Sequence, residues 1–444
     1  MTRNLKRRSV LKTIGISGAA LTFAGLAAAT DGQARYIAET DGDANSEIES
    51  AGFEILAKLA DDTVVLVKGT EDAADDLGDV RGVSTAVPDF AVEFKGPNVS
   101  SDDVGTDGDG VDAGDVYDEY LWDKRVQQVR EAHEYATGAG QTVAVIDTGV
   151  DDTHPDLDVD VERSVTIVDG RPAEHTGDSG FHGTHVAGTI AGADDVAMVG
   201  TAPDATLVSV RVLGPDTGTF GDILVGMQYA GEIGATAANM SIGYMRLPRD
   251  ADVGAYRQLF EPVANSVARD GTVLVGSGGN DETDLKGGWL RLWNGLAGVM
   301  GVSALTHEDE LSYYSNYGTN DIDVGSPGGG YETMEKTFVE DPDEVARPWP
   351  LNAVFSTVPK ENSLPDPYVD TTINGEAYGW LMGTSMAAPQ VTGLAALVRE
   401  LEPDFSSRRV ENAIKRGAEG ANGQGDDALG AGRTNALNTV ESLD

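Results

Sequence analysis

Short apolar segments, spaced in two different ways, divide the chain into its predicted parts. From residue 121 onward, apolar runs such as 142–146 (TVAVI) and 272–275 (TVLV) alternate with segments such as 222–231, in which apolar residues recur every three or four positions. Short β-branched runs are typical of strands buried on both faces, and the three-to-four spacing is typical of helices. Their alternation predicts an α/β domain over residues 121–444, with helices on both faces of a parallel sheet.

The segment 35–95 has a different pattern and is predicted to form a small α+β unit. Residues 53–59 and 63–67 are expected strands, residues 71–77 a short helix, and residues 83–94 a returning strand. A unit of about 60 residues buries little surface and is expected to be marginally stable by itself. It is either an independent binding domain or a segment that docks on the larger domain.

Residues 96–120 form the predicted linker between these two parts. The segment is rich in aspartate and glycine, including the run DGDG at 107–110. Clustered carboxylates suggest calcium, but the ligand spacing of an EF-hand loop is absent. Because runs of this composition are typical of solvated chain, we predict an acidic linker.

The charge of the chain is strongly unbalanced. It has 74 Asp and Glu residues against 31 Lys and Arg residues, which gives a formal charge of −43, and the acidic residues occur throughout the sequence. A chain of this kind has no basic face for phosphates, so we expect no nucleic-acid partner. Dispersed carboxylates favour a self-repelling surface that is screened at high salt, as in salt-adapted proteins. The chain has no cysteine, which excludes disulfides and Cys-based zinc sites.

The first 34 residues are predicted to be an export signal. Arg7 and Arg8 precede a Gly/Ala-rich apolar stretch, 14–29, that ends in three alanines. Twin arginines, a mildly apolar core and a small-residue cleavage site are typical of twin-arginine signal peptides. A membrane anchor is the alternative, but a spanning helix needs about 20 apolar residues. We therefore predict a twin-arginine signal peptide over residues 1–34, and a secreted, extracellular protein that has no membrane attachment after signal removal.

Two polar residues are expected at the edge of the sheet where parallel strands end, which is where active sites of such sheets lie. Asp147 follows the predicted strand 142–146, where its carboxylate can orient an imidazole; the alternative is an ordinary aspartate in a turn. His182 begins a predicted helix of small residues, FHGTHVAG at 181–188, and is placed to act as a general base. His185, one turn further along, is expected to be a packing residue.

A serine and an asparagine complete the candidate chemistry. Ser385 lies in GTSMAAP (383–389), just before the apolar run 391–401, which places it on the first turn of a buried helix. The free N–H groups and dipole of that end favour negative charge on an attacked carbonyl, although a serine there can also be a simple helix cap. Asn280 ends GSGGN (276–280), where its amide can donate to an oxyanion; alternatively, it only tolerates a left-handed turn.

Together these segments resemble the active-site motifs of the subtilases, the subtilisin-like serine proteases. DTG at 147–149, HGTHVAG at 182–188 and GTSMAAP at 383–389 match the three motifs of the family in its order. The acidic composition adds a resemblance to the halolysin-type enzymes of halophiles. The resemblance covers residues 121–444 and implies an α/β fold, a subtilisin-like parallel sheet flanked by helices and preceded by a small α+β propeptide.

The resemblance also implies a reaction and the residues that carry it out. The chain is expected to be a serine endopeptidase acting on polypeptide substrates, with Ser385 as nucleophile, His182 as general base and then acid, and Asp147 orienting the imidazole. Asn280 and the Ser385 backbone N–H are the expected oxyanion donors. No cofactor is needed for this chemistry. The alternative is a catalytically silent binding protein on the same fold, because a fold does not fix a function.

Residues that bind the substrate follow from the same resemblance. Ser241, Ile242 and Gly243 match the family's substrate-binding strand, which pairs with an extended peptide; Gly218 is expected in the opposite loop, and Gly278 is also assigned to substrate binding.

The segment 35–95 corresponds to the family's propeptide, which inhibits the enzyme and is cleaved by it. Its last strand, ending near Phe94, is expected to lie in the site. This implies a zymogen with its own propeptide as intramolecular inhibitor, and we expect a monomer.

Several positions depart from the family pattern. Tyr244 replaces a second glycine and is expected to narrow the main side-chain pocket. The segments 245–261, 284–296 and 331–352 are expected insertions, and loops at the rim of a site commonly tune specificity.

Asp156 matches a calcium ligand of the family, but the partner loop near Asp194 is one residue shorter. A structural calcium therefore stays an open possibility, and we assign no residue as a metal ligand.

Overall fold

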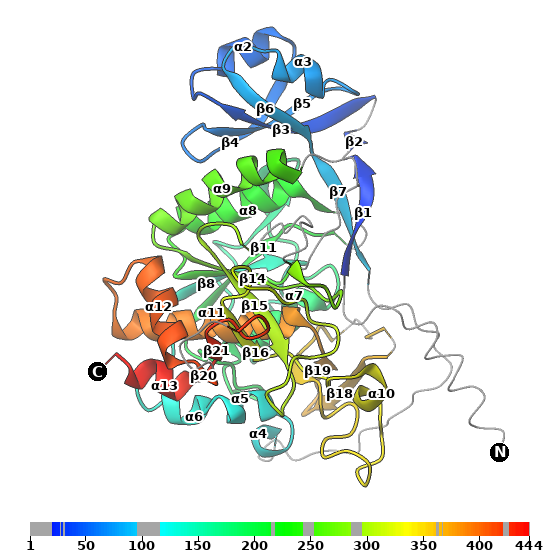
Figure 1. Cartoon of the computed structure of the whole chain (residues 1–444), viewed down its shortest axis with the longest axis vertical. Helices are drawn as coiled ribbons and strands as arrows, with labels where there is room; N and C mark the ends of the chain where they lie inside the picture. Colours follow the sequence, from blue (N-terminus) through cyan, green and yellow to red (C-terminus); the bar gives the residue numbers. More distant parts are fainter. Residues whose placement is uncertain are drawn as a thin grey trace, which may run out of the picture.

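The structure is a computed structural model in which a small N-terminal unit lies on a larger α/β domain (Figure 1). The described residues are 20–26, 28–29, 32–95, 116–214, 218–242, 253–285, 295–360, 364–365, 367–420 and 426–443. Most of the linker predicted over residues 96–120 lies outside them, as do residues 1–19 of the predicted export signal. Within the described part of the chain, no helix combines the length and apolar character that a membrane crossing requires.

A ten-stranded, mainly parallel sheet forms the centre of the larger domain, with strand order β10-β9-β11-β8-β13-β14-β15-β16-β21-β20. Parallel pairing joins the strands from β9 to β21, and antiparallel pairs add β10 and β20 at the two edges. The strands are β8 (Thr142–Asp147), β9 (Val165–Val168), β10 (Arg171–Glu174), β11 (Thr206–Arg211), β13 (Ala237–Met240), β14 (Val273–Ser277), β15 (Val299–Leu305), β16 (Val324–Pro327), β20 (Glu419–Gly420) and β21 (Gly432–Arg433).

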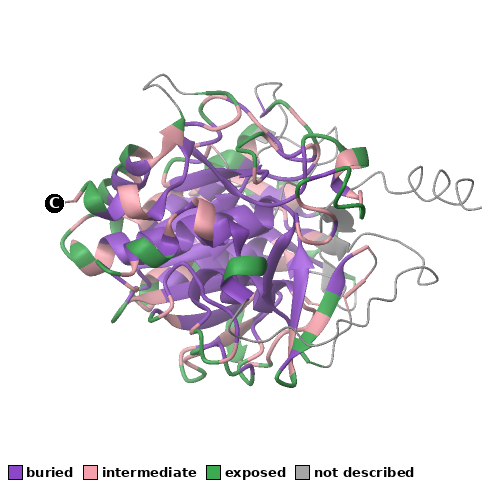
Figure 2. Ribbon diagram, turned by 90° about the horizontal axis from the view of Figure 1, so that it is seen from below, coloured by how far each residue is buried: buried purple, intermediate pink, exposed green. Residues whose placement is uncertain are grey.

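Alternate side chains of the strands face two different layers of helices, because successive residues of a strand point to opposite faces. In β8, Val143 and Val145 pack with α7 (His182–Ala191) and α11 (Thr384–Leu401). Ala144 and Ile146 pack on the other face with α8 (Phe220–Glu232) and α9 (Val253–Arg269). Seen from below, the sheet and its adjoining helices form the buried interior (Figure 2). The predicted helix-covered parallel sheet is confirmed.

Smaller elements surround this core. A three-stranded antiparallel sheet, β17-β19-β18, was not predicted from the sequence; its strands are β17 (Val354–Thr357), β18 (Val369–Ile373) and β19 (Glu376–Leu381). The remaining helices are α4 (Val116–Glu119), α5 (Trp122–Val126), α6 (Val129–Ala132), α10 (Met334–Thr337), α12 (Ser407–Gly417) and α13 (Ala436–Glu441).

The N-terminal unit is a five-stranded antiparallel sheet with two short helices. Its elements are β2 (Ala28–Ala29), β3 (Gln33–Thr40), α2 (Asn45–Ser50), β4 (Glu54–Leu59), β5 (Val64–Thr70), α3 (Ala74–Gly78) and β6 (Val83–Pro88). One face of the sheet, including Tyr36 and Val65, packs on the unit's own helices. The other face, including Ile37 and Leu66, packs with residues of α8 and α9. The apolar residues on this second face are therefore buried against the larger domain and not within the unit itself.

The predicted strand over residues 83–94 is in fact two strands that belong to different sheets. β6 pairs with β3 and ends at Pro88, and β7 (Phe90–Lys95) pairs with β12 (Gly218–Thr219) of the larger domain. Asp89 separates them, because its side chain is buried in contacts with Arg35 and with the first turn of α8. On its other side, β7 pairs with β1 (Ala20–Leu26), which lies within the predicted export signal.

Candidate active site

Three of the predicted site residues lie at or just beyond the carboxyl ends of neighbouring parallel strands. Asp147 is the last residue of β8, Ser241 directly follows β13, and Asn280 lies three residues after β14. These strands are adjacent in the order β8-β13-β14, so their carboxyl ends share one edge of the sheet. Each of the three residues contacts the first turn of a buried helix there, either α7 or α11.

Asp147 and His182 are in direct contact. The Asp147 Oδ1 atom lies 2.8 Å from His182 Nδ1, and the two residues are 0% and 2% exposed. Asp147 Oδ1 also accepts a hydrogen bond from the Thr148 backbone N–H at 2.8 Å. With Nδ1 donating to the carboxylate, the neutral imidazole presents Nε2 as its basic nitrogen.

Glycines allow the β8 turn and the start of α7 to approach this closely. A Cβ atom on Gly183 would lie 1.9 Å from the Gly149 carbonyl oxygen, and one on Gly149 would lie 2.1 Å from the Gly177 carbonyl oxygen. Gly149 also has a φ of 105°, a conformation that glycine adopts at little cost. Gly149 and Gly183, the glycines of the DTG and HG sequences, therefore allow Asp147 and His182 to come within hydrogen-bonding distance.

Asp178 connects the same two segments and was not recognised in the sequence. Its carboxylate accepts hydrogen bonds from the Thr148 hydroxyl at 2.8 Å and from the Thr184 backbone N–H and hydroxyl at 3.0 and 2.6 Å. Thr148 in turn accepts from the Gly183 N–H at 3.0 Å. Desolvation raises the pKa of Asp178 above its ordinary value, although the hydrogen bonds to its carboxylate act to lower that pKa. In the sequence, Asp178 is marked only by being an acidic residue four positions before His182.

Ser385 lies on the first turn of α11 and is 3% exposed. Its hydroxyl donates to the Ser241 carbonyl oxygen at 3.1 Å. In return, the Ser241 hydroxyl donates to the Ser385 carbonyl oxygen at 2.8 Å and accepts from the Asn239 side-chain amide at 2.9 Å. The end of β13 therefore holds the first turn of α11, which carries Ser385, in place. The sequence predicted that Ser241 binds the substrate, but it did not predict this contact with α11.

Asn280 is oriented by the residue before the serine. Its Oδ1 atom accepts from the backbone N–H and the hydroxyl of Thr384, both at 2.9 Å, which directs the Nδ2 donor elsewhere. A Cβ on Gly383 would lie 3.4 Å from Asn280 Nδ2, so glycine leaves that space open. The left-handed residue of this turn is Gly279, with a φ of 92°, and Asn280 itself has no positive φ. The turn therefore does not explain why an asparagine is present.

The predicted substrate-binding residues occupy different surroundings. Gly218 pairs with Val92 of β7, so the edge of β12 already holds an extended segment of the chain. Ile242 is 1% exposed and belongs to the apolar cluster between the sheet, α8 and α9. Gly243, like Tyr244, lies outside the described residues.

Gly278 uses its own backbone groups within the fold. Its N–H donates to the Val302 carbonyl oxygen at 2.8 Å, and its carbonyl oxygen accepts from the Asn316 side-chain amide at 3.0 Å. Its main contribution in this structure is to hold the turn that ends in Asn280.

His185 is fully buried, which confirms the expected packing role. Its Nε2 atom lies 3.1 Å from the Val354 carbonyl oxygen and 3.2 Å from that of Gly379. Desolvation lowers its pKa to about 3, so it stays neutral at physiological pH. It therefore links α7 to the three-stranded sheet and takes up no proton.

The surroundings of Asp156 do not fit a calcium ion. Its carboxylate accepts from the backbone N–H groups of Val196, Ala197 and Met198 at 2.6, 3.1 and 3.0 Å, and from the Tyr378 hydroxyl at 2.6 Å. A calcium site presents oxygen acceptors to the cation, whereas here the loop turns donors toward the carboxylate. Asp156 thus holds the loop 193–198 directly.

Among the described residues, one cluster of acidic side chains has its carboxylate oxygens close enough to one another to hold a cation. Glu308, Glu310 and Glu332 are all exposed, and their carboxylate oxygens lie within 4.8 Å of one another. The Lys336 Nζ atom lies 3.0 Å from Glu308 and 3.1 Å from Glu332. Lys336 therefore already forms ion pairs with two of the three carboxylates.

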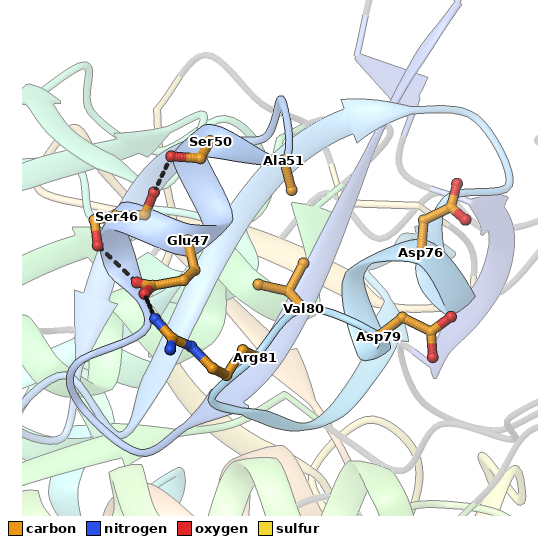
Figure 3. A pocket seen from close by; sticks show the side chains of 8 residues that line it. All are labelled: Ser46, Glu47, Ser50, Ala51, Asp76, Asp79, Val80 and Arg81. Carbon is orange, nitrogen blue, oxygen red and sulfur yellow. Dashed lines mark hydrogen bonds and ion pairs between the residues drawn. The ribbon is translucent and has the colours of Figure 1, made fainter.

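A hollow on the N-terminal unit is separate from all of these residues (Figure 3). It lies between α2 and α3, on the side of the unit that faces away from α8 and α9 (Figure 1). Glu47 spans part of it through contacts with Ser46 and Arg81. The lining residues are Ser46, Glu47, Ser50, Ala51, Asp76, Asp79, Val80 and Arg81. No group at this hollow resembles the catalytic set.

Comparison with known proteins identifies the same family that the motifs resemble. The model of the subtilase family matches residues 138–432. Subtilisin BL of Lederbergia lenta is 32% identical over 296 residues, which cover 66% of this chain and 89% of that protein. M-protease of Shouchella clausii is 32% identical over 298 residues, which cover 67% of this chain but only 63% of that protein. The structure of the epidermin leader peptide processing serine protease of Staphylococcus aureus superposes with a TM-score of 0.71 at 18% identity, covering 93% of this chain and 99% of that one, and supports the fold alone.

Proposed function

The chain belongs to the subtilase family, the subtilisin-like serine proteases, and from this premise we propose that it is a secreted serine endopeptidase made as a zymogen. The observation that carries the proposal is the 2.8 Å contact between Asp147 and His182 at the sheet edge where α11 also presents Ser385. A buried carboxylate, an imidazole and a hydroxyl on a helix N-terminus are the groups that acyl transfer requires.

The proposed reaction begins when Ser385 Oγ attacks the carbonyl carbon of a peptide bond. His182 Nε2 accepts the hydroxyl proton, and the Asp147 carboxylate stabilises the imidazolium through Nδ1. His182 then returns the proton to the departing amine as the C–N bond breaks, which leaves an acyl ester on Ser385. Water attacks the ester in a second cycle of the same transfers and restores the hydroxyl. Asn280 Nδ2 and the Ser385 N–H donate to the oxyanion that forms in each half-reaction.

A direct test separates this activity from a silent binding protein on the same fold. The full-length protein is expressed, allowed to mature and incubated with casein, beside a Ser385→Ala variant. We expect hydrolysis by the wild type and none by the variant. Folded wild-type protein that leaves casein intact would favour the silent binder, and equal hydrolysis by both proteins would remove Ser385 from the mechanism.

The N-terminal unit is proposed to be an inhibitory propeptide that the enzyme removes. The support is its position: β7 occupies the edge of β12, which any extended substrate would need. We expect Ser385→Ala to accumulate as a precursor that still contains residues 35–95, and the wild type to lose them. A processed variant would show that another protease cleaves the chain, and N-terminal sequencing identifies the site.

Export and salt adaptation are further parts of the proposal. The twin arginines support secretion by the twin-arginine route, and the charge of −43 supports a halolysin-like adaptation to salt. If dispersed carboxylates repel one another, casein hydrolysis and the melting temperature should both rise from low to molar salt. No change in either would contradict the adaptation without affecting the protease assignment.

A further inference from the structure

The first turn of α7, which carries His182, is capped from outside the helix. The residue before the helix, Phe181, makes no side-chain hydrogen bond to its N–H groups. The first N–H groups of a helix have no carbonyl partner within the helix, so they need acceptors from elsewhere. The Thr148 hydroxyl supplies one acceptor, 3.0 Å from the Gly183 nitrogen. The order of this first turn therefore depends on other segments of the chain.

Asp178 supplies the second acceptor and brings a negative charge to this end of the helix. One carboxylate oxygen accepts from the Thr184 N–H at 3.0 Å and from the Thr184 hydroxyl at 2.6 Å. The other accepts from the Thr148 hydroxyl and the Gly180 N–H, both at 2.8 Å. The helix dipole also favours a carboxylate at a helix N-terminus. Four donors thus hold the Asp178 side chain in one orientation.

The same carboxylate joins the two halves of the predicted catalytic pair. Thr148 directly follows Asp147 in the chain, and Thr184 lies two residues after His182. The Thr184 hydroxyl also accepts from the Asp151 N–H at 2.9 Å, so the turn after β8 is tied to α7 at both of its ends. The 2.8 Å contact between Asp147 and His182 lies between these attachments. Its length is therefore set partly by hydrogen bonds outside the pair.

We propose that Asp178 is a positioning residue for peptide-bond hydrolysis, because it holds the turn after β8 and the first turn of α7 at the separation where Asp147 meets His182. The inference rests on the proposed endopeptidase function and adds a residue to it. Asp178 acts through Thr148 and Thr184, so it is not a member of the catalytic triad. General-base catalysis requires the base to be precisely placed, and a misplacement of about 1 Å can lower a rate about 100-fold. An ordinary helix cap, by contrast, would affect stability alone.

The kinetics of an Asp178→Asn variant test the inference. Asparagine keeps the shape of the side chain but turns an NH2 group toward donors that now face a carboxylate oxygen. Matured full-length enzymes are assayed with a quenched fluorescent peptide built on a casein bond that the wild type cleaves, and active enzyme is counted by complete fluorophosphonate labelling. We expect kcat to fall at least about tenfold while KM changes less than about twofold.

Asp160→Asn is the matched control. The Asp160 carboxylate accepts from the Arg163 N–H at 3.0 Å and from its guanidinium at 2.6 Å, so it also holds a local turn. Arg163 contacts the Thr142 hydroxyl at the amino end of β8, opposite the edge that carries Asp147. Asp160→Asn should therefore keep the wild-type kcat even if its melting temperature falls.

Variants of Thr148 test whether Asp178 acts through this hydroxyl. Thr148→Val removes the hydroxyl and should also lower kcat, whereas Thr148→Ser keeps it and should recover most of that loss. In the double variant Asp178→Asn/Thr148→Val, the loss of kcat should be smaller than the product of the two single losses, because both changes break one chain of contacts.

The outcomes separate failure of this inference from failure of the proposed function. Wild type that cleaves neither casein nor the peptide would refute the endopeptidase function and this inference with it. Active wild type together with an Asp178→Asn variant of unchanged kcat would refute the positioning role alone, whatever the change in melting temperature. If Asp178→Asn fails to fold, the Thr148 variants decide: equal kcat for Thr148→Val and Thr148→Ser would refute the inference.

Discussion

A buried charge cluster between the N-terminal unit and the larger domain should make their contact weaken as the pH rises. Asp89 is 0% exposed and lies 3.0 Å from the Arg35 guanidinium. Arg35 also lies 2.8 Å from Asp222 and 3.6 Å from the exposed Asp169, so one guanidinium faces three carboxylates. Desolvation raises the pKa of Asp89 from 3.8 to about 6, although Arg35 alone would lower it. The docked state therefore favours a proton on Asp89.

The size and sign of the effect follow from the raised pKa of Asp89. A pKa that is higher when the unit is docked stabilises docking fully below pH 3.8, and this stabilisation is lost as the pH rises through about 6. Because each tenfold change in proton affinity corresponds to about 1.4 kcal/mol, the docking free energy should weaken by about 3 kcal/mol. Asp89→Asn keeps the shape and an acceptor for the Gly221 N–H but does not titrate, so it should remove this part of the pH dependence.

Hydrogen exchange can measure the contact without separating the two parts. The full-length Ser385→Ala protein and the Ser385→Ala/Asp89→Asn protein are compared from pH 4 to pH 7.5, with rates corrected for intrinsic exchange. Over this pH range, the opening free energy of amides in β5 should fall by about 2–3 kcal/mol more in the protein that retains Asp89. Identical pH dependence in both proteins, or a contact that strengthens with pH only when Asp89 is present, would refute the reasoning.

Three further predictions concern the larger domain. Asn280→Ala should lower kcat by about 10²–10³ with little change in KM, as expected for one oxyanion donor of a subtilisin-like site; unchanged kcat would remove Asn280 from the mechanism. Gly183→Ala places a Cβ 1.9 Å from a backbone oxygen and should lower the free energy of unfolding by at least about 1–3 kcal/mol. Gly180→Ala is the control: the nearest atom to its Cβ is 3.9 Å away, so its thermal unfolding should match that of the wild type. Equal destabilisation of the two variants would contradict this. Tyr378→Phe should lower the free energy of unfolding by about 1–3 kcal/mol, because it removes one hydrogen-bond donor from the buried Asp156 carboxylate. If this loop holds no calcium, a chelator should leave the melting temperature of the wild type unchanged. A large decrease with chelator that Asp156→Asn abolishes would contradict this.

Local patterns were sufficient to predict the elements that carry the candidate chemistry. The apolar runs at 142–146 and 272–275 correspond to β8 and β14 within two residues, because strands buried on both faces need continuous apolar sequence. Ser385 and His182 lie on the first turns of α11 and α7, as their small-residue and apolar surroundings predicted.

The features that were missed depend on partners far away in the sequence. Pro88 is a local signal for the end of a strand, because proline has no N–H to donate to a sheet. The change of sheet after it depends on Asp89, which meets Arg35 and, more than 100 residues away, Gly221 at the N-terminus of α8. Asp178 likewise resembled an ordinary loop residue, since its importance comes from hydrogen bonds to Thr148 and Thr184. Such contacts form only when the chain has folded, so they leave no periodic signal.

The most direct test of the account is to locate the reactive serine by chemical labelling. Mature wild-type protein is treated with a fluorophosphonate, the loss of casein hydrolysis is followed, and the labelled peptide is sequenced by tandem mass spectrometry. We expect one adduct, on Ser385, formed in proportion to the loss of activity. Inactivation with the adduct on the neighbouring Ser241, or full activity after complete labelling of Ser385, would contradict it.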